Sequence, residues 1–589
     1  MSDRTDLAAL RRSVERAQRL RAMSSGPATA EGWTAEGSTA EGSTAEGGVA
    51  ETVPPPVEAP AAPGLVTWLR ARLAGRTWPL AALLGLVALA VRATGLARAN
   101  ELFIDELTYA EVATDVASGH LPQQFGAPFF LHPIGSFLIN GAAIRLFGLS
   151  GSYMDLVYPL RWVNTVLGAV SVALAVVLVR RLGGTAAAVM AGLVLAFDPF
   201  LLRQDGRVMI ETPATLWLLA GWVVLLGSRR DAAPDDLAGD LPPDAPAPRT
   251  PVSTRRAVVA GLLLGLALVT KDLTAFASVV PLVLAGRWRR TLPWRTVRRV
   301  LAAVPVPYLL YLAVVTVAGE LPALLGDKVG GVLRLVGIDQ ETGFNANPDA
   351  SLSARLVEMV TRFGTSYVLL GLGLFAGIVA AYSTEPGRRL VGLIAAVTGA
   401  LGIYCVAAGA AEEQFGYYVV VTSVLALGAL WGELTERRPS WRRPAAVVAL
   451  TFTLLTVGLG VSARTTADDS IPRARAFLGT LPADARVGVT DVTGEFGLLP
   501  HEGWGVWPSL TSLDGNGAQY VLTRSHQLDQ GYGYAAPEML GWLAEHATPV
   551  FTATGPSGGA TVVWRLDRAA VAASVAAGRT LPPVTGGYP

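Results

Sequence analysis

Two adjacent acids, Asp105 and Glu106, lie in the stretch FIDELTYAEVA, a few residues after the first strongly apolar segment of the chain. Acids in the first turn of a helix interact favourably with the helix dipole, and aspartate is a common helix cap. A carboxylate at such a place can also act as a general base toward a substrate hydroxyl. The two roles are compatible, because a cap fixes the position of the carboxylate.

Several cations and further acids are also placed near the ends of apolar segments. The cations are Arg92, Arg98, Arg145, Arg161, Arg203, Arg207 and Lys271, and the acids are Asp205, Glu211, Asp272, Glu412 and Glu413. Ionisable residues at membrane depth usually pair with one another, face a cavity or serve a function. One interpretation is a set of ion pairs that tie helix ends together. The other is an outward-facing polar site whose guanidinium groups bind phosphate through paired hydrogen bonds.

The composition indicates an integral membrane protein. Of the 589 residues 51% are hydrophobic and only 16% are charged, against about 25% charged in soluble domains; mean hydropathy is +0.43. The net charge of +1 gives no bulk signal for nucleic acid. A single cysteine, Cys405, excludes an intramolecular disulfide and a cysteine-rich zinc site, and the five histidines show no HExxH spacing.

About eleven segments are apolar over the roughly 20 residues that a membrane-spanning helix needs. They begin near Trp78, Trp162, Gly184, Thr212, Ala257, Asp272, Val300, Ser366, Val391, Tyr417 and Ala445. Every second connection is rich in arginine, as in RWRRTLPWRTVRR and ERRPSWRR. Because basic residues accumulate on the cytoplasmic side, this alternation predicts a multi-pass protein of the cell membrane with its N-terminus inside and its C-terminus outside.

Composition also divides the chain. Residues 1–77, with TAEG repeats and a proline-rich end, are predicted to be a disordered cytoplasmic tail. Residues 78–463 form the predicted transmembrane domain, and 464–589 a soluble extracytoplasmic α/β domain with strands at ARVGVTDV and ATVVWRLD and a helix at PEMLGWLAEHA. The long outer connection near 319–355 is predicted to be a mobile loop over an outer site.

The first outer loop, residues 97–161, is predicted to hold two helices. FIDELTYAEVATDVASG has Phe103 and Leu107 on one face and Asp105, Thr108 and Asp115 on the other, which indicates an amphipathic helix at the membrane interface. FFLHPIGSFLINGAAIRLFG is apolar, but a span here would break the charge alternation, so a second interfacial helix is preferred to a true span or a re-entrant segment.

This loop resembles the first outer loop of polytopic GT-C glycosyltransferases, above all the protein O-mannosyltransferase and aminoarabinose transferase group, glycosyltransferase family 39. Those enzymes open the loop with Asp-Glu and continue with a basic residue and proline, here His132-Pro133. RQDGRVMIETPATLWLL and GLLLGLALVTKD resemble later family segments, and the likeness runs through most of Leu80 to Leu430. HPIGSF lacks the lysine that usually follows in protein O-mannosyltransferases, which weakens the case for a protein acceptor.

The resemblance implies transfer of a sugar, with mannose favoured, from a polyprenyl phosphate to an acceptor hydroxyl on the outer side, with inversion. Asp105 is the implied general base, and Glu106 assists it or binds the acceptor. The residues implied to bind the lipid phosphate or the sugar are His132, Arg161, Arg203, Arg207, Glu211 and Lys271. The lipid donor needs no nucleotide-sugar motif, and a divalent metal is compatible but not required.

The acceptor class stays open at this stage between a protein, a glycan, a lipid and a secreted natural product. Two other classes of function also stay open. A transporter or a flippase for lipid-linked sugars also places charges in outer cavities, but such proteins often contain inverted repeats, and no convincing internal repeat is present. A membrane protein without chemistry has no need of so many outer arginines.

Overall fold

The computed structural model describes residues 77–583 except 125, 228–251, 289–290, 337, 339–356, 358–359, 362, 409–415, 500 and 530–532. The predicted N-terminal tail and the acids Glu412 and Glu413 therefore lie outside the described residues.

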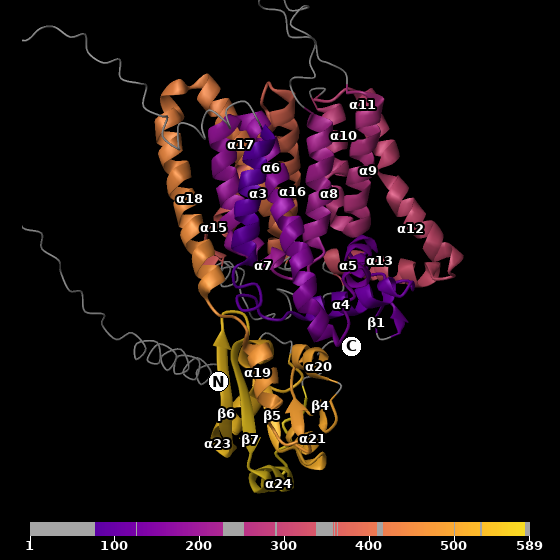
Figure 1. Cartoon of the computed structure of the whole chain (residues 1–589), viewed down its shortest axis with the longest axis vertical. Helices are drawn as coiled ribbons and strands as arrows, with labels where there is room; N and C mark the ends of the chain where they lie inside the picture. Colours follow the sequence, from indigo (N-terminus) through magenta and orange to yellow (C-terminus); the bar gives the residue numbers. More distant parts are fainter. Residues whose placement is uncertain are drawn as a thin grey trace, which may run out of the picture. The chain divides into compact units, whose positions relative to one another are not determined.

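Long apolar helices make up the first part of the described chain and run side by side (Figure 1). They are α3 (Thr77–Ala93), α6 (Tyr153–Phe197), α8 (Glu211–Leu226), α9 (Thr254–Thr270), α10 (Val279–Arg287), α11 (Trp294–Ala303), α12 (Pro305–Val317), α15 (Thr365–Ala381), α16 (Pro386–Ala408), α17 (Gly416–Arg437) and α18 (Arg442–Thr465). Five helical segments in the described ranges are long and apolar enough to cross a membrane. The predicted helical membrane architecture is confirmed, while the number of spans stays a prediction.

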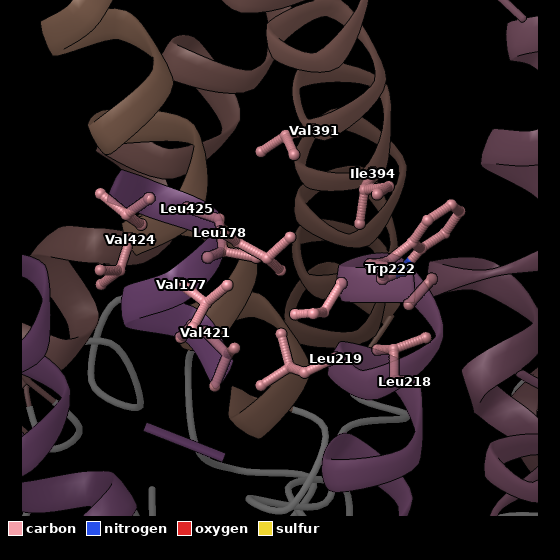
Figure 2. Packing of buried hydrophobic residues seen from close by; sticks show 14 of the residues in the cluster. Val177, Leu178, Leu218, Leu219, Trp222, Val391, Ile394, Val421, Val424 and Leu425 are labelled. Atoms are coloured by element: carbon pink, nitrogen blue, oxygen red, sulfur yellow. The ribbon is translucent and has the colours of Figure 1, made fainter. Parts of the chain in front are cut away.

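The core of the bundle is formed mainly by aliphatic side chains, with several aromatic ones, from helices far apart in the sequence. Figure 2 shows Val177 and Leu178 of α6, Leu218, Leu219 and Trp222 of α8, Val391 and Ile394 of α16, and Val421, Val424 and Leu425 of α17. Two helices approach each other closely where one of them has a glycine, because glycine has no side chain. A Cβ on Gly183 would lie 2.2 Å from the carbonyl oxygen of Gly428, so a side chain there would separate α6 from α17.

Two of the predicted spans are halves of one kinked helix. The 45 residues of α6 would measure about 68 Å if straight, twice the hydrocarbon thickness of a bilayer. Gly184 interrupts the helix with φ 81° and ψ −175°, a conformation that glycine adopts without the steric cost of a Cβ. The predicted segments that begin near Trp162 and Gly184 meet at this break.

Shorter elements connect the bundle helices. They are α4 (Ile104–Ala117), β1 (Gln123–Gln124), β2 (Ala127–Pro128), α5 (Gly135–Phe147), α7 (Pro199–Asp205), η3 (Asp272–Ala277), α13 (Leu321–Leu335) and η6 (Pro439–Trp441). With 13 residues, α5 is about 20 Å long, too short to cross a bilayer core of about 30 Å. The expected mobile loop near 319–355 is wrong for its first half, because that half forms α13.

The amphipathic prediction for α4 is also wrong. Thr108, expected on an exposed polar face, is 8% exposed, and Glu111 is buried as well. The helix is enclosed because α5, α6 and a helix of the C-terminal region, α20 (Val492–Leu498), pack against it. It is a buried element of the protein and not a helix with one side in water.

The C-terminal region, residues 466–583, contains a five-stranded sheet in the order β4-β3-β5-β7-β6. Its strands are β3 (Val487–Val489), β4 (Trp504–Val506), β5 (Tyr520–Arg524), β6 (Ala547–Gly555) and β7 (Gly559–Leu566), and its helices are α19 (Ser470–Leu478), α20 (Val492–Leu498), α21 (Leu510–Gly515), α22 (Ser525–Asp529), α23 (Glu538–His546) and α24 (Arg568–Ala576). Strand β3 is parallel to β4 and β5, whereas β7 is antiparallel to β5 and β6. The predicted strands correspond to β3 and β7, and the predicted helix to α23.

Candidate active site

The start of α4 separates the two acids. The N-cap residue is Phe103, in an extended conformation, so Asp105 lies inside the first turn and the expected Asp105 cap is wrong. It is Glu106 that reaches back, with its Oε1 accepting a hydrogen bond of 3.3 Å from the Phe103 N–H. Successive helix residues point about 100° apart, so the two carboxylates face different surroundings.

Glu106 points into a buried ion-pair network. Arg161 donates to both of its oxygens, from Nε to Oε2 at 2.8 Å and from Nη2 to Oε1 at 2.9 Å. The Val208 N–H donates to Oε2 at 3.2 Å, and Arg207 Nε lies 3.9 Å from Oε1. Glu106 and Arg161 are both 0% exposed. These contacts occupy the carboxylate and keep it from an acceptor.

Two of the arginines predicted to bind phosphate, Arg161 and Arg207, donate hydrogen bonds to backbone carbonyls. Arg161 Nη1 donates to the Asn100 carbonyl at 3.0 Å, and Arg161 and Arg207 both donate to the carbonyl of Glu101. The Arg203 guanidinium lies 5.5 Å from the ring centre of Phe363. None of these three arginines lines the cavity that Asp105 faces.

Asp105 lines a cavity of about 350 Å³, within the range of about 300–1,000 Å³ typical of small-molecule sites. Five parts of the chain contribute the side chains used in the argument below. They are Asp105, Thr108 and Tyr109 of α4, His132 of the following loop, Lys271 and Asp272 at the junction of α9 and η3, Asp327, Lys328 and Arg334 of α13, and Val492 and Phe496 of α20. The structure thus brings Asp105, His132 and Lys271 together, as predicted, and adds α13 and α20.

Lys271 enters the cavity because the chain turns sharply there. The residue ends α9 and precedes η3 with extended torsions, φ −152° and ψ 120°. Its ammonium group lies 3.0 Å from Oε1 of Glu211, which is 0% exposed at the first position of α8. Glu211 therefore positions the lysine from outside the cavity. The lysine lines the cavity with its ammonium group largely buried.

Helix α13 supplies cations that the sequence analysis missed. Lys328 Nζ lies 2.6 Å from Oδ2 of Asp272 and donates to the Leu131 carbonyl at 3.1 Å. Oδ2 of Asp327 accepts from the Phe130 N–H at 2.7 Å. These contacts join α13 to the loop that carries His132. The adjacent Asp327 and Lys328, with Arg334 two turns later, are the only signal in the sequence for this contribution.

His132 is held between two aromatic rings. Its ring centre lies 5.7 Å from that of Tyr109 and 6.0 Å from that of Phe129. Burial lowers the pKa of His132 well below its usual value, and the positive charges of Lys271 and Lys328 lower it further. The imidazole is therefore neutral near pH 7 and can offer a hydrogen bond but no charge to a phosphate.

Within the described residues, no group of three or more histidine, cysteine, aspartate or glutamate side chains lies close enough together to hold a metal ion. Two carboxylates of the cavity already have basic or backbone partners, since Asp272 contacts Lys328 and Asp327 accepts from the Phe130 N–H.

The family model described as dolichyl-phosphate-mannose-protein mannosyltransferase matches residues 82–321. The matched range contains Asp105, His132 and Lys271, and it ends before Lys328. No match was found among curated proteins.

Solved structures resemble the chain at low identity. ArnT from Cupriavidus metallidurans bound to undecaprenyl phosphate is 15% identical with a TM-score of 0.46, over 82% of this chain and 98% of that one. The archaeal oligosaccharyltransferase AglB from Archaeoglobus fulgidus, with an inhibitory peptide and a dolichol-phosphate, is 13% identical with a TM-score of 0.49, over 84% and 74%. The S. cerevisiae Pmt1-Pmt2 complex bound to the sugar donor is 20% identical with a TM-score of 0.32, over 42% and 34%.

Proposed function

We propose that the chain is a glycosyltransferase of the GT-C superfamily and that it transfers a sugar from a polyprenyl phosphate to an acceptor hydroxyl. One observation carries the proposal. Asp105 lines the same cavity as Lys271, Lys328 and Arg334, whereas its neighbour Glu106 is locked in a buried network. A base and a group of cations are what this reaction requires, because a proton must be removed at one end and a phosphate must leave at the other.

In the proposed reaction Asp105 removes the proton of the acceptor hydroxyl. The acceptor oxygen forms a bond to the anomeric carbon from the side opposite the phosphate, and the bond from that carbon to the phosphate oxygen breaks. The electron pair leaves with the polyprenyl phosphate, which departs as a phosphomonoester, and the sugar configuration is inverted. A positioned base of this kind contributes about 10²–10⁴-fold to the rate.

The cations of the cavity stabilise the leaving phosphate. Lys271 and Lys328 are both largely buried, and a preorganised charge in such surroundings acts more strongly than one in water. In this proposal Lys271 keeps the role expected from the sequence, and Lys328 and Arg334 take the role that was expected of Arg161, Arg203 and Arg207. The neutral His132 orients the donor or Asp105 through a hydrogen bond.

Mannose as the sugar is supported by the family model, which is named for mannosyltransferases that use dolichyl phosphate. The alternation of basic connections supports action on the outer side of the cell membrane. The phosphate-linked lipids named in the resembling structures fit a donor of the same class in this chain. The acceptor is proposed only as a hydroxyl compound that can reach Asp105.

The test uses the purified full-length protein in lipid nanodiscs. Polyprenyl-phosphate mannose and GDP-mannose are supplied in parallel, with benzyl alcohol as a surrogate acceptor, and products are identified by mass spectrometry. We expect release of polyprenyl phosphate together with free mannose or benzyl mannoside, and no consumption of the nucleotide sugar. Movement of intact polyprenyl-phosphate mannose across a vesicle membrane without bond cleavage would instead establish the flippase alternative.

A further inference from the structure

One wall of the cavity comes from the C-terminal region and not from the membrane helices. Val492 and Phe496, one helical turn apart on α20, line it together with Asp105 and Tyr109 of α4. Val492 is 2% exposed and Phe496 is half-buried, so the phenylalanine presents the larger surface to the cavity.

Helix α20 is held in this position by hydrogen bonds to its residues and by close packing on the start of α4. Oδ1 of Asp491 caps it by accepting from the Gly494 N–H at 2.9 Å, and the Tyr534 hydroxyl donates to Glu495. Gly497 allows close packing on the start of α4, since a Cβ there would lie 3.3 Å from a methyl carbon of Leu102. The wall is therefore part of the packed structure.

A buried carboxylate joins the C-terminal region to the segment that leads into α4. Glu101, 1% exposed, accepts from the Ser470 N–H at 3.0 Å and from the Ile471 N–H at 3.4 Å. Arg524 of β5, also 1% exposed, lies 3.8 Å from the same carboxylate. The backbone of Glu101 in turn accepts from Arg161, which holds Glu106. The C-terminal region and the start of α4 are thus connected through the buried contacts of Glu101.

The cavity contains both cations and apolar side chains. Its cations, Lys271, Lys328 and Arg334, come from the end of α9 and from α13, while α20 contributes an apolar surface. A phosphate gains nothing from a valine and a phenylalanine, because burying charge against apolar groups is unfavourable. The apolar wall next to Asp105 therefore suits the partner whose hydroxyl Asp105 deprotonates.

We propose that Phe496, backed by Val492, is a specificity-determining residue that contacts an aliphatic or aromatic group beside the reacting hydroxyl of the acceptor. This inference rests on the proposed function, since it needs a sugar transfer at Asp105. It gives the C-terminal region a role in acceptor selection and identifies the acceptor class as hydroxyl compounds with an adjoining apolar group.

The test is a competition between two alcohols. Wild type, Phe496→Ala and Phe496→Leu receive polyprenyl-phosphate mannose with equal concentrations of benzyl alcohol and methanol, and the ratio of benzyl to methyl mannoside is measured. We expect wild type to favour benzyl alcohol and Phe496→Ala to lower the ratio about 10-fold, the lower end of what hydrophobic contacts achieve in discrimination. Phe496→Leu, which keeps more apolar volume, should fall between them.

Phe551→Ala is the matched control, because Phe551 is also a half-buried phenylalanine of the C-terminal region but does not line the cavity. Its product ratio should equal that of wild type. An unchanged ratio in Phe496→Ala, or a change confined to the KM for the donor, would overturn the inference while leaving the proposed function standing. Absence of donor turnover in wild type would overturn both.

Discussion

The cavity and the buried network beside it use the same kinds of charged side chain in different surroundings. In the network, Glu106 receives hydrogen bonds from Arg161 and the Val208 N–H, and it has no exposure to solvent. In the cavity, Asp105 is only half-buried, and Lys271 lines the same cavity. The two carboxylates are consecutive in the chain, and the turn of the helix alone assigns one to each region.

This difference indicates that a fully buried charged side chain with several hydrogen-bond partners serves the stability of the fold. A charged side chain that lines a cavity can instead take part in chemistry. Removing one partner of a buried pair leaves an uncompensated charge, which is strongly destabilising. A charge that still reaches a cavity can be replaced at a lower cost to the fold, but its chemistry is lost. The following predictions test this contrast.

The largest effect on stability is expected for Glu106→Gln. The change leaves the buried guanidinium of Arg161 without its counter-charge, and we expect a loss of about 3–5 kcal/mol of folding free energy. The measurement is the thermal unfolding midpoint of the purified protein. Asp105→Asn is the matched control, since it alters the neighbouring carboxylate in the same way and should leave the midpoint nearly unchanged. Equal unfolding midpoints in the two variants would contradict the proposed difference between the buried network and the cavity.

A smaller effect is expected on donor affinity when Lys271 is replaced. Because Lys271→Met alone would strand the buried Glu211, the comparison is between Glu211→Gln and the double variant Lys271→Met/Glu211→Gln. Hydrogen bonds to charged groups contribute roughly 1.5–3 kcal/mol, so binding of undecaprenyl phosphate should weaken about 10- to 100-fold in the double variant. Equal affinities would show that Lys271 does not bind the phosphate.

The lowered pKa of His132 predicts a dependence of stability on pH. Between that pKa and about 6.5 the unfolded chain binds more protons than the folded one, so folding stability falls as pH drops through this window. The slope contributed is at most about 1.4 kcal/mol per pH unit. Unfolding midpoints of wild type and His132→Gln should converge above pH 6.5 and separate below it, with the variant more stable. Parallel curves down to pH 5 would contradict this prediction.

The smallest effect is expected at an exposed ion pair. Arg475 Nη1 lies 2.9 Å from Oδ1 of Asp155, but the two side chains are 41% and 47% exposed. Exposed pairs contribute about 0.2–1 kcal/mol, so Arg475→Gln should lower the unfolding midpoint only slightly at low salt and not at high salt. A loss as large as that of Glu106→Gln would show that pairing matters more than burial.

The long helices were predictable from the sequence, because their signal is local. An apolar segment is expected near Thr212 and α8 begins at Glu211, and the segment expected near Ser366 corresponds to α15, which begins at Thr365. Three residues of the cavity, Asp105, His132 and Lys271, could also be named from the sequence, because each lies at or near the end of an apolar segment or helix. The positions of these residues depend on sequence patterns within a few residues of each of them.

The rest of the site depends on contacts between distant residues. Lys328 contacts Leu131 and Asp272 because α13 packs next to them. The sequence of α13 favours a loop because Gly326 and Gly330 have low helix propensity. Arg161 was assigned to a phosphate because an arginine at a helix end gives no sign that its partner is Glu106. The wall from α20 could not be foreseen, because it depends on how the C-terminal region packs on α4.

The most direct test of the account is the rate of the first turnover after donor binding. Asp105→Asn is mixed with polyprenyl-phosphate mannose and benzyl alcohol, and product formation is followed by rapid quench alongside equilibrium binding of the donor. We predict a rate lower by about 10²–10⁴-fold with unchanged donor affinity, as expected when a general base is removed. A wild-type rate in this variant would show that Asp105 is not the base and would contradict the account.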